Sequence, residues 1–273
     1  MRLVPIKKSY VRARDGAQLF CAWSDGPADT RIVLVHSLAM DHAFWSPVVG
    51  ELAGVASIVA MDCRGHGKSD KPRGRYSVEQ FADDVADVVD AARWSKAIVA
   101  GASMGGCVCL AFAARHAQRC SGLGLFDTTA WYGPQAPAQW AERADKALVQ
   151  GLDSLVDFQK TRWFGDRFRA ERSDVVNESV AVFLRNDPVA YAETCRMLGA
   201  CDLRAVLGDV RVPTRIAVGE EDYATPLAMA ESLHIGIPGS TLTVIQEGRH
   251  LTPLEHPVLI AGELKQLIKT RVQ

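Results

Sequence analysis

The sequence predicts an α/β fold, in which a parallel sheet carries helices on both of its faces. Short apolar runs rich in Val, Ile and Leu alternate along the chain with amphipathic segments at helical spacing, which is the pattern of such a sheet. The chain has 273 residues, 48% of them hydrophobic. This length is enough for one large α/β domain, or for one domain that carries an insertion.

The strands are predicted in order along the chain. An opening hairpin is expected around Asp15 and Gly16, because this pair favours a tight turn between the β-rich stretches 9–16 and 17–26. Buried strands are then expected at residues 31–37, 56–63, 96–103 and 121–127. Two more strands, each with the loop that follows it, are expected at residues 212–222 and 240–250.

Two amphipathic helices accompany these strands. The first follows Ser77, which forms a capping box with Gln80, and its apolar face comprises Phe81, Val85, Val88 and Ala92. The second closes the chain, with an apolar face that comprises Leu259, Ile260, Leu264, Leu267 and Ile268. Both faces are expected to pack on the sheet.

The segment from Trp131 to Leu207 breaks the alternation of strands and helices. It contains patterns for three or four helices and for no strand; these patterns fall within residues 137–165, 167–186 and 187–208. Because strands are predicted on both sides of this segment, it is expected to be an insertion. The predicted domains are a core of residues 1–130 and 208–273 and a helical insert of residues 131–207.

The composition indicates a protein that acts on small molecules. The formal net charge is −1 and charged residues do not gather in runs, so nothing favours nucleic acid or an anionic membrane as a partner. Charges interrupt the N-terminal residues, and no stretch has the apolar length of a membrane span. Seven cysteines are scattered without metal-binding spacing, so we expect no metal site and a reducing cytoplasm.

Residues 99–106 read VAGASMGG and place a single serine, Ser103, between a strand and a helix. This Gly-x-Ser-x-Gly pattern is typical of a sharp strand-to-helix turn, in which Gly101 and Gly105 let the neighbouring chain pass closely. Such a turn exposes the hydroxyl at the carboxyl edge of the sheet and at a helix N-terminus, where developing negative charge is stabilised. Ser103 is therefore the predicted nucleophile.

A serine hydroxyl needs a base and an orienting acid, and this strand–turn–helix context orders the three along the chain as Ser, acid, His. Asp222 and His250 each end one of the last two strand-and-loop units, so both are expected at the same sheet edge as Ser103. They are the predicted acid and base. Glu221 and Asp127 are the alternative acids.

Two backbone amides are predicted to form an oxyanion hole. One belongs to Met104, directly after the nucleophile, and the other to Leu38, in the loop after the first buried strand. A separate loop, MDCRGHGKSDKP, contains Gly65 and Gly67, which suit a tight turn, and His66 is expected to be its structural hydrogen-bonding partner. His36, His42, His116 and His256 are expected to be structural as well.

The segments DCRGHGKS, GASMGG, GEEDYATP and GRHLTPLEHP together resemble the α/β-hydrolases, and the resemblance covers essentially the whole chain. Within that superfamily the chain is most similar to the 3-oxoadipate enol-lactonases, through HSLAMDHAFW, FDTTA, TRWFG and YAETCRMLGACDLR. Ala39 stands where that family more often has glycine. The resemblance implies an eight-stranded, mostly parallel sheet with a helical cap inserted after the sixth strand.

The resemblance also implies an activity, the hydrolysis of a small carboxylate-bearing lactone through an acyl-enzyme, with no metal or organic cofactor. A substrate carboxylate needs a cation, and Arg162 and Arg196 of the cap are the candidates. Trp163 is expected either to line the pocket or to pack the cap, and Trp131 begins a segment expected at the pocket mouth.

Three alternatives use the same scaffold: a carboxylesterase of broader specificity, a carbon–carbon bond hydrolase, and a non-catalytic binding protein. The retained Ser103 and His250 argue against the last of these. The protein is expected to be a monomer or a homodimer.

Overall fold

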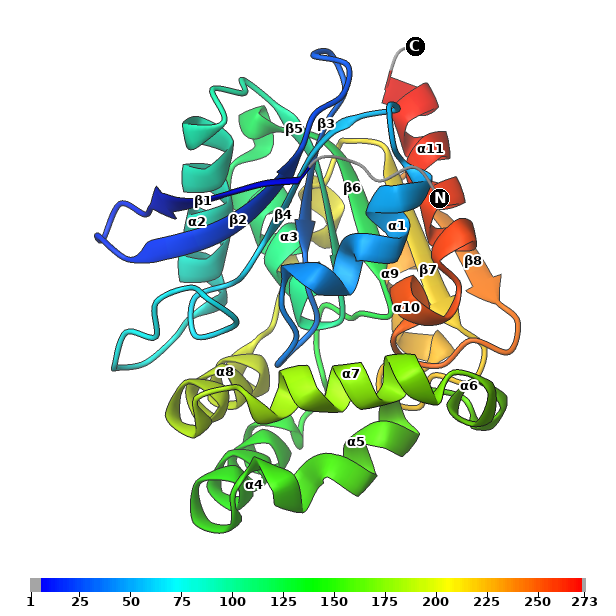
Figure 1. Ribbon diagram of the computed structural model, residues 1–273. Coiled ribbons are helices and arrows are strands. Elements are labelled where there is room, and N and C mark those ends of the chain that lie inside the picture. Colours follow the sequence, from blue (N-terminus) through cyan, green and yellow to red (C-terminus); the bar gives the residue numbers. More distant parts are fainter. Residues whose placement is uncertain (1–5, 272–273) are drawn as a thin grey trace.

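The computed structural model describes residues 6–271 and has at its centre an eight-stranded sheet (Figure 1). The strands lie in the order β1-β2-β4-β3-β5-β6-β7-β8. Their bounds are β1 Ile6–Arg12, β2 Gln18–Ser24, β3 Arg31–Val35, β4 Ser57–Met61, β5 Ala97–Ala102, β6 Cys120–Phe126, β7 Thr214–Gly219 and β8 Thr241–Ile245. All eight correspond to strands predicted from the sequence.

The sheet is mixed but mostly parallel. β1 and β2 form the predicted hairpin, and β2 pairs antiparallel with β4. Every pairing from β4 through β3, β5, β6 and β7 to β8 is parallel. The carboxyl ends of these six strands therefore lie at one edge, which brings together the loops that follow β3, β5, β6, β7 and β8.

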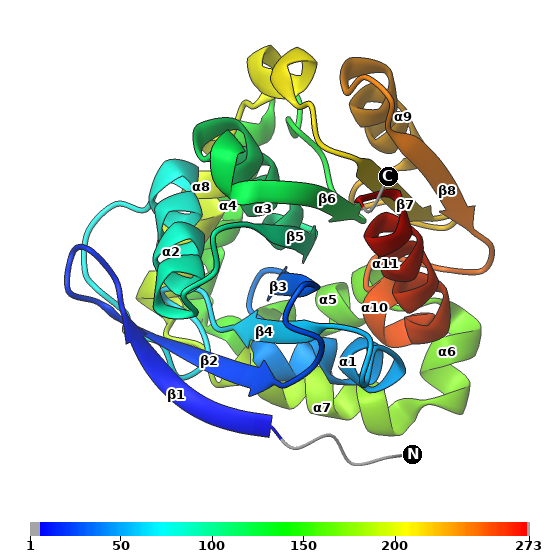
Figure 2. The same cartoon turned by 90° about the horizontal axis from the view of Figure 1, so that it is seen from above.

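Helices cover both faces of the sheet, as the apolar patterns predict. In Figure 2, α1 (Ser46–Glu51) and α11 (Pro257–Arg271) lie on one face, and α2 (Val78–Ala91), α3 (Met104–Arg115) and α9 (Leu227–Gly236) lie on the other. Ser77 caps α2 by accepting a hydrogen bond from the Gln80 amide at 3.2 Å. The Gln80 side chain bonds to Asp15 rather than completing the capping box. In α11, Leu259 is 52% exposed, so it does not belong to the buried face.

Between β6 and β7 the chain forms a helical cap, α4 to α8, that lies across the carboxyl edge of the sheet (Figure 1). The helices are α4 Ala136–Gln150, α5 Val156–Trp163, α6 Asp166–Glu171, α7 Ser173–Leu184 and α8 Pro188–Ala200. There are five where three or four were expected. Gly151, with φ 81°, ends α4, and the non-helical backbone of Arg172, with φ −125° and ψ 49°, separates α6 from α7.

Within residues 6–271, no helix combines the length and the apolar character that crossing a membrane requires. All seven cysteines are buried free thiols.

Candidate active site

Ser103 lies on the turn between β5 and α3, in a strained backbone conformation with φ 54° and ψ −118°. The two flanking glycines are required by close contacts. A Cβ on Gly101 would overlap the Gly105 carbonyl, and a Cβ on Gly105 would overlap the Val35 carbonyl at the end of β3. The sharp turn predicted from the Gly-x-Ser-x-Gly pattern is therefore present, and it presses the start of α3 against the loop that follows β3.

His250 bridges Ser103 and Asp222. Its Nε2 lies 2.9 Å from Ser103 Oγ, and its Nδ1 lies 2.8 Å from Asp222 Oδ2. Because an ionised carboxylate can only accept, Nδ1 carries the proton and Nε2 is free to accept the Ser103 hydroxyl proton. The three side chains come from the ends of β5, β7 and β8 and are at most 6% exposed, so the serine, the imidazole and the carboxylate interact out of bulk water.

The Asp222 carboxylate is held by its own loop. Oδ1 accepts hydrogen bonds from the amides of Ala224 and Thr225 at 2.7 and 2.9 Å, and Oδ2 accepts one from Thr225 Oγ1 at 2.8 Å. Burial alone would raise the pKa of Asp222, but the adjacent His250 and these hydrogen bonds hold that pKa below its usual value. Asp222 is therefore ionised at neutral pH.

The two alternative acids have other partners. Glu221 is exposed and pairs with Arg249 at 2.9 Å. Asp127 is buried and accepts hydrogen bonds from the Gly219 amide and from the amide and hydroxyl of Thr252, at 3.1, 3.0 and 2.6 Å. Burial and the nearby charge of Asp222 raise the pKa of Asp127 well above its usual value. Asp127 thus joins the end of β7 to the loop that carries His250 without touching the imidazole.

The loop after β3 lies beside the nucleophile, as the oxyanion-hole prediction requires. Ser37 and Leu38 line a small chamber together with Ser103 and His250. His36 fixes this loop, because Nδ1 bonds to the Ser37 carbonyl at 2.8 Å and Nε2 accepts from the Cys63 amide at 3.0 Å. Ala39 adopts φ 61°, a conformation that glycine takes more readily. Leu38 and Met104 as oxyanion donors remain a prediction.

The neighbouring loop with Gly65 and Gly67 has the tight turn that was expected. Both glycines have positive φ, 80° and 49°, and a Cβ on Gly67 would overlap the Asp62 carboxylate. His66 is buried, and its Nδ1 bonds to the Arg64 carbonyl at 3.0 Å, which is a structural contact within the same loop.

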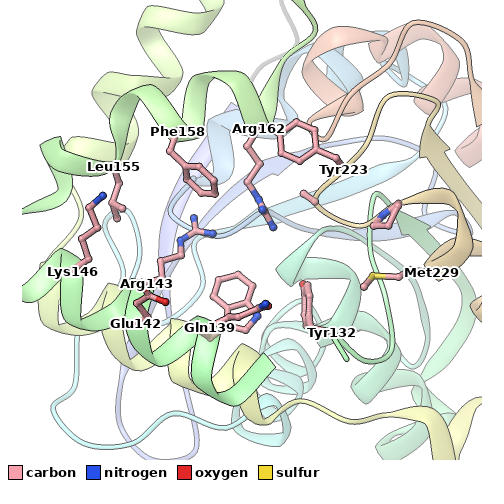
Figure 3. Close-up of a pocket in the computed structure, with 13 residues that line it drawn as sticks. Tyr132, Gln139, Glu142, Arg143, Lys146, Leu155, Phe158, Arg162, Tyr223 and Met229 are labelled. Atoms are coloured by element: carbon pink, nitrogen blue, oxygen red, sulfur yellow. The ribbon is translucent and has the colours of Figure 1, made fainter. Parts of the chain in front are cut away.

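A larger cavity of about 540 Å³ opens between the cap and the loop after β7 (Figure 3). The chamber at Ser103 is much smaller, about 10 Å³, and the two spaces share four lining residues. These are Tyr132, Trp140, Arg143 and Arg162. The outer cavity therefore adjoins the chamber that contains the serine.

Arg143 of α4 and Arg162 of α5 point into the outer cavity towards each other (Figure 3). Arg143 donates from Nε to the Tyr191 hydroxyl at 2.7 Å, and its guanidinium lies 5.0 Å from the centroid of the Trp140 ring. Arg162 lies over the Phe158 ring at 5.6 Å. In residues 6–271 no acidic side chain forms a salt bridge with either arginine. Burial, with the like charge of Arg143, lowers the pKa of Arg162 to about 10. Such a pair favours an anion between them.

The structure brings some of the predicted substrate-binding residues to the cavities but not others. Arg162 lines both cavities, and Trp163 lines the inner chamber while also packing on Phe183, with ring centroids 5.5 Å apart. Arg196 does not reach them: it is exposed on α8 and is paired with Asp145 and Glu193. Trp131 also lies outside both cavities, stacked under the Arg204 guanidinium at 3.7 Å.

Sequence reasoning missed two residues of the site, Arg143 and Gln159. Arg143 lies in a stretch of mixed charges, AERADKA, which is indistinguishable from an exposed helix face. Gln159 is 1% exposed and lines the inner chamber, and no donor of the described chain reaches its Oε1. A buried amide oxygen without a partner beside the nucleophile is suited to contact a bound substrate.

The fold and the Ser103–His250 pairing define the class of protein: the chain belongs to the α/β-hydrolase family, and the model of the alpha/beta hydrolase fold matches residues 30–257. Among curated relatives, it is 30% identical to the 3-oxoadipate enol-lactonase 1 of Acinetobacter baylyi, over 85% of this chain and 86% of the relative. It is 27% identical to the pimeloyl-[acyl-carrier protein] methyl ester esterase of Aromatoleum aromaticum, over 87% and 98%.

Among solved structures, the chain is similar to the enol-lactonase from Burkholderia xenovorans LB400. The TM-score is 0.90 and the identity is 30%, and the match covers 96% of this chain and 100% of that one. The relatives thus include both enol-lactonases and an esterase, which share a fold and differ in the substrate that each name gives.

Proposed function

We propose that this protein is a serine hydrolase that opens a small carboxylate-bearing lactone, of the enol-lactone kind, through an acyl-enzyme. One observation carries the proposal: His250 lies in hydrogen-bond contact with both Ser103 and Asp222, in a small chamber that adjoins a cavity with two arginines, and within residues 6–271 neither arginine forms a salt bridge with a carboxylate. The similarity to two enol-lactonases of Acinetobacter baylyi supports it, at 30% and 28% identity.

In the first half of the reaction, Ser103 becomes acylated. Its hydroxyl proton passes to His250 Nε2 while Oγ attacks the lactone carbonyl, and the amides of Leu38 and Met104 stabilise the oxyanion. Collapse of the tetrahedral intermediate breaks the ring C–O bond, and His250 returns the proton to the departing enol oxygen. The released enol tautomerises to a ketone, which makes ring opening favourable.

In the second half, water cleaves the acyl-enzyme. A water molecule gives a proton to His250 Nε2 as its oxygen attacks the ester carbonyl, and Ser103 takes that proton back when the carboxylic acid leaves. Asp222 keeps the imidazole in the same tautomer and orientation throughout. These steps use no metal or organic cofactor. We place the reaction in a reducing cytoplasm, which suits seven buried free thiols.

The remote carboxylate of the substrate binds between Arg143 and Arg162. Arg162 forms no salt bridge with another residue of the described chain, whereas Arg143 is already oriented by Tyr191. A carboxylate placed between them offsets the repulsion of the two guanidinium groups and accepts hydrogen bonds from both.

A carboxylesterase of broader specificity is the second candidate. Its supporting observation is the size of the outer cavity, about 540 Å³, together with an aromatic lining that includes Trp140 and Phe158. Such a space also accommodates acyl groups larger than a small lactone.

Replacing Arg162 with Ala is expected to separate these two candidates. For a charged lactone, kcat/KM should fall by an amount that corresponds to about 2–5 kcal/mol, as for other buried charge pairs. Neutral p-nitrophenyl esters should be almost unaffected, because they do not use this contact. The measurement is a hydrolysis panel of dicarboxylic enol-lactones, saturated lactones and neutral esters.

Arg196→Ala is the matched control, because Arg196 belongs to the same cap but lies outside both cavities. It should leave both activities unchanged. Equal losses on both substrates in Arg162→Ala would mean that Arg162 holds the cap together. If the unmodified enzyme hydrolysed neutral esters faster than charged lactones, the carboxylesterase would be the better description.

A further inference from the structure

The backbone of the catalytic loop is held by the cap. The amides of His250 and Leu251 both donate to the carbonyl of Trp163, the last residue of α5, at 3.1 Å each. Arg249 donates from its guanidinium to the Thr161 carbonyl at 2.9 Å. The position of the imidazole that faces Ser103 therefore depends on where this end of the cap lies.

A buried carboxylate, that of Glu255, forms a second connection between the cap and the catalytic loop. Glu255 is the last residue of α10 (Thr252–Glu255) and is 9% exposed. Its Oε1 accepts a hydrogen bond from the Gly165 amide of the cap at 2.8 Å, and its Oε2 accepts one from the Arg249 amide at 2.7 Å. Glu255 thus joins the residue before His250 to Gly165, the residue that precedes α6.

Only a carboxylate can make this bridge, because both of its oxygens face N–H donors. A Gln at the same place offers one oxygen and must turn its NH₂ group towards the other amide, so one of the two links is lost. The side chain of Glu255 reaches neither Ser103 nor the substrate cavities, and it acts through the backbone of Arg249 and His250.

Charged groups of several elements surround this carboxylate. Burial has the largest effect on this carboxyl group and raises the pKa of Glu255 to about 7. The positive charge of Arg249 acts in the opposite direction and lowers this pKa, whereas the negative charge of Glu221 raises it further. Other charged or titratable residues line the adjacent cavity of about 510 Å³, namely Asp166, Arg167, Glu171, Glu247 and His256.

We propose that Glu255 is a positioning residue, whose two hydrogen bonds lock the cap segment at Gly165 to the loop at Arg249 and so hold His250 in line between Ser103 and Asp222. Arg162, which lines the substrate cavity, is the neighbour of Trp163 in α5, so the same contact links substrate binding in the cap to the geometry of the imidazole. The inference rests on the proposed function only in requiring that His250 activates Ser103.

Two independent variants of the full-length protein break the bridge. Glu255→Gln removes one acceptor and keeps the shape of the side chain. Gly165→Pro removes the cap donor, and the backbone at Gly165, with φ −60° and ψ 156°, accepts proline, as does the extended Phe164 before it. Gly165→Ala is the comparison for the second variant, because it keeps the amide and its Cβ would meet nothing closer than 3.5 Å.

We expect kcat to fall on the order of 10–100-fold in Glu255→Gln, because a small displacement of a catalytic group has effects of this size. KM should stay within about twofold, since the cavity residues are untouched. Gly165→Pro should lose more activity than Gly165→Ala, and the double variant Glu255→Gln/Gly165→Pro should be no worse than the poorer single variant, because both changes break one connection. Glu171→Gln, an exposed neutralisation nearby, should leave kcat and KM unchanged.

A pH series separates positioning from a general loss of stability. In the unmodified enzyme Glu255 becomes protonated as the pH falls below its pKa of about 7, and the protonated carboxyl group has one acceptor oxygen fewer for the two amides. The Gln variant lacks this second acceptor at every pH. The ratio of kcat between the unmodified enzyme and Glu255→Gln should therefore decrease as the pH is lowered from about 8 to about 6.

The rate at which a phosphonate labels Ser103 gives a readout that needs no knowledge of the substrate. This rate should fall in Glu255→Gln together with kcat. An unchanged labelling rate, an unchanged kcat below the unfolding temperature, or a ratio that does not vary with pH would overturn the proposal. A different result would contradict the proposed function alone: the charged lactones would not be hydrolysed, while the rate of Ser103 labelling would still depend on Glu255.

Discussion

Ser103→Ala is expected to abolish turnover while the protein stays folded. The hydroxyl is the atom that His250 Nε2 contacts at 2.9 Å, and without it neither substrate carbonyl nor phosphonate has a nucleophile to react with. The loss in kcat should be on the order of 10⁶-fold, the scale seen when a serine nucleophile is removed. Alanine tolerates the φ of 54° no worse than serine does, so the turn should be kept.

The measurements are kcat on a charged lactone and on a p-nitrophenyl ester, and mass spectrometry of the phosphonate-treated protein. Thermal unfolding at an unchanged temperature shows that the fold is intact. In the unmodified enzyme the label should be found on Ser103 and nowhere else. If the variant kept more than a few per cent of the activity, another residue would have to be the nucleophile.

The fold and the Ser103, Asp222 and His250 cluster could be predicted because they depend on local pattern and on topology. A strand followed by Gly-x-Ser-x-Gly leaves few conformations for the turn at Ser103, and the structure has the strained one. Parallel strands end at a common edge, so residues that follow β5, β7 and β8 meet although up to 147 positions separate them.

The polar lining of the cap could not be predicted, because it depends on how helices rotate when they pack. Arg143 and Arg196 both lie on helices with mixed charges, yet one points into the cavity and the other is paired at the surface. Sequence periodicity does not distinguish these two orientations when most residues on the buried side of the helix are small, as in α4, where Ala136, Ala144 and Ala147 are buried beside a single large residue, Trp140.

The hydrogen-bond partners of the buried carboxylates could not be predicted from the sequence either. Glu255 and Asp127 accept hydrogen bonds chiefly from backbone amides, at sequence separations of 90 residues for Gly165 and 125 for Thr252. Any residue except proline offers such a donor, so no side-chain pattern reveals it. The sequence therefore indicates Asp127 only as an alternative acid, although in the structure its contacts join two loops.

Asp222→Asn should lower kcat on the order of 10⁴-fold, the scale known for the acid of other Ser-His-Asp sites. The amide oxygen can still accept from Ala224 and Thr225 in place of Oδ1, so the loop should keep its shape. The NH₂ group then faces His250 Nδ1 in place of Oδ2, and Nδ1 must become an acceptor. The ring proton moves to Nε2, which can no longer take the proton of Ser103.

Asp127→Asn is the informative comparison, because Asp127 is the other buried carboxylate at this sheet edge. Its Oδ2 accepts from both the amide and the hydroxyl of Thr252, and an NH₂ group there would face a donor. The main effect should be a lower unfolding temperature, with a smaller loss of kcat than in Asp222→Asn, since His250 keeps its acid and its tautomer. The two variants are compared by kcat and by thermal unfolding side by side. If Asp127→Asn removed the activity and Asp222→Asn kept it, Asp127 would be the acid and the contact between Asp222 and His250 would have another purpose.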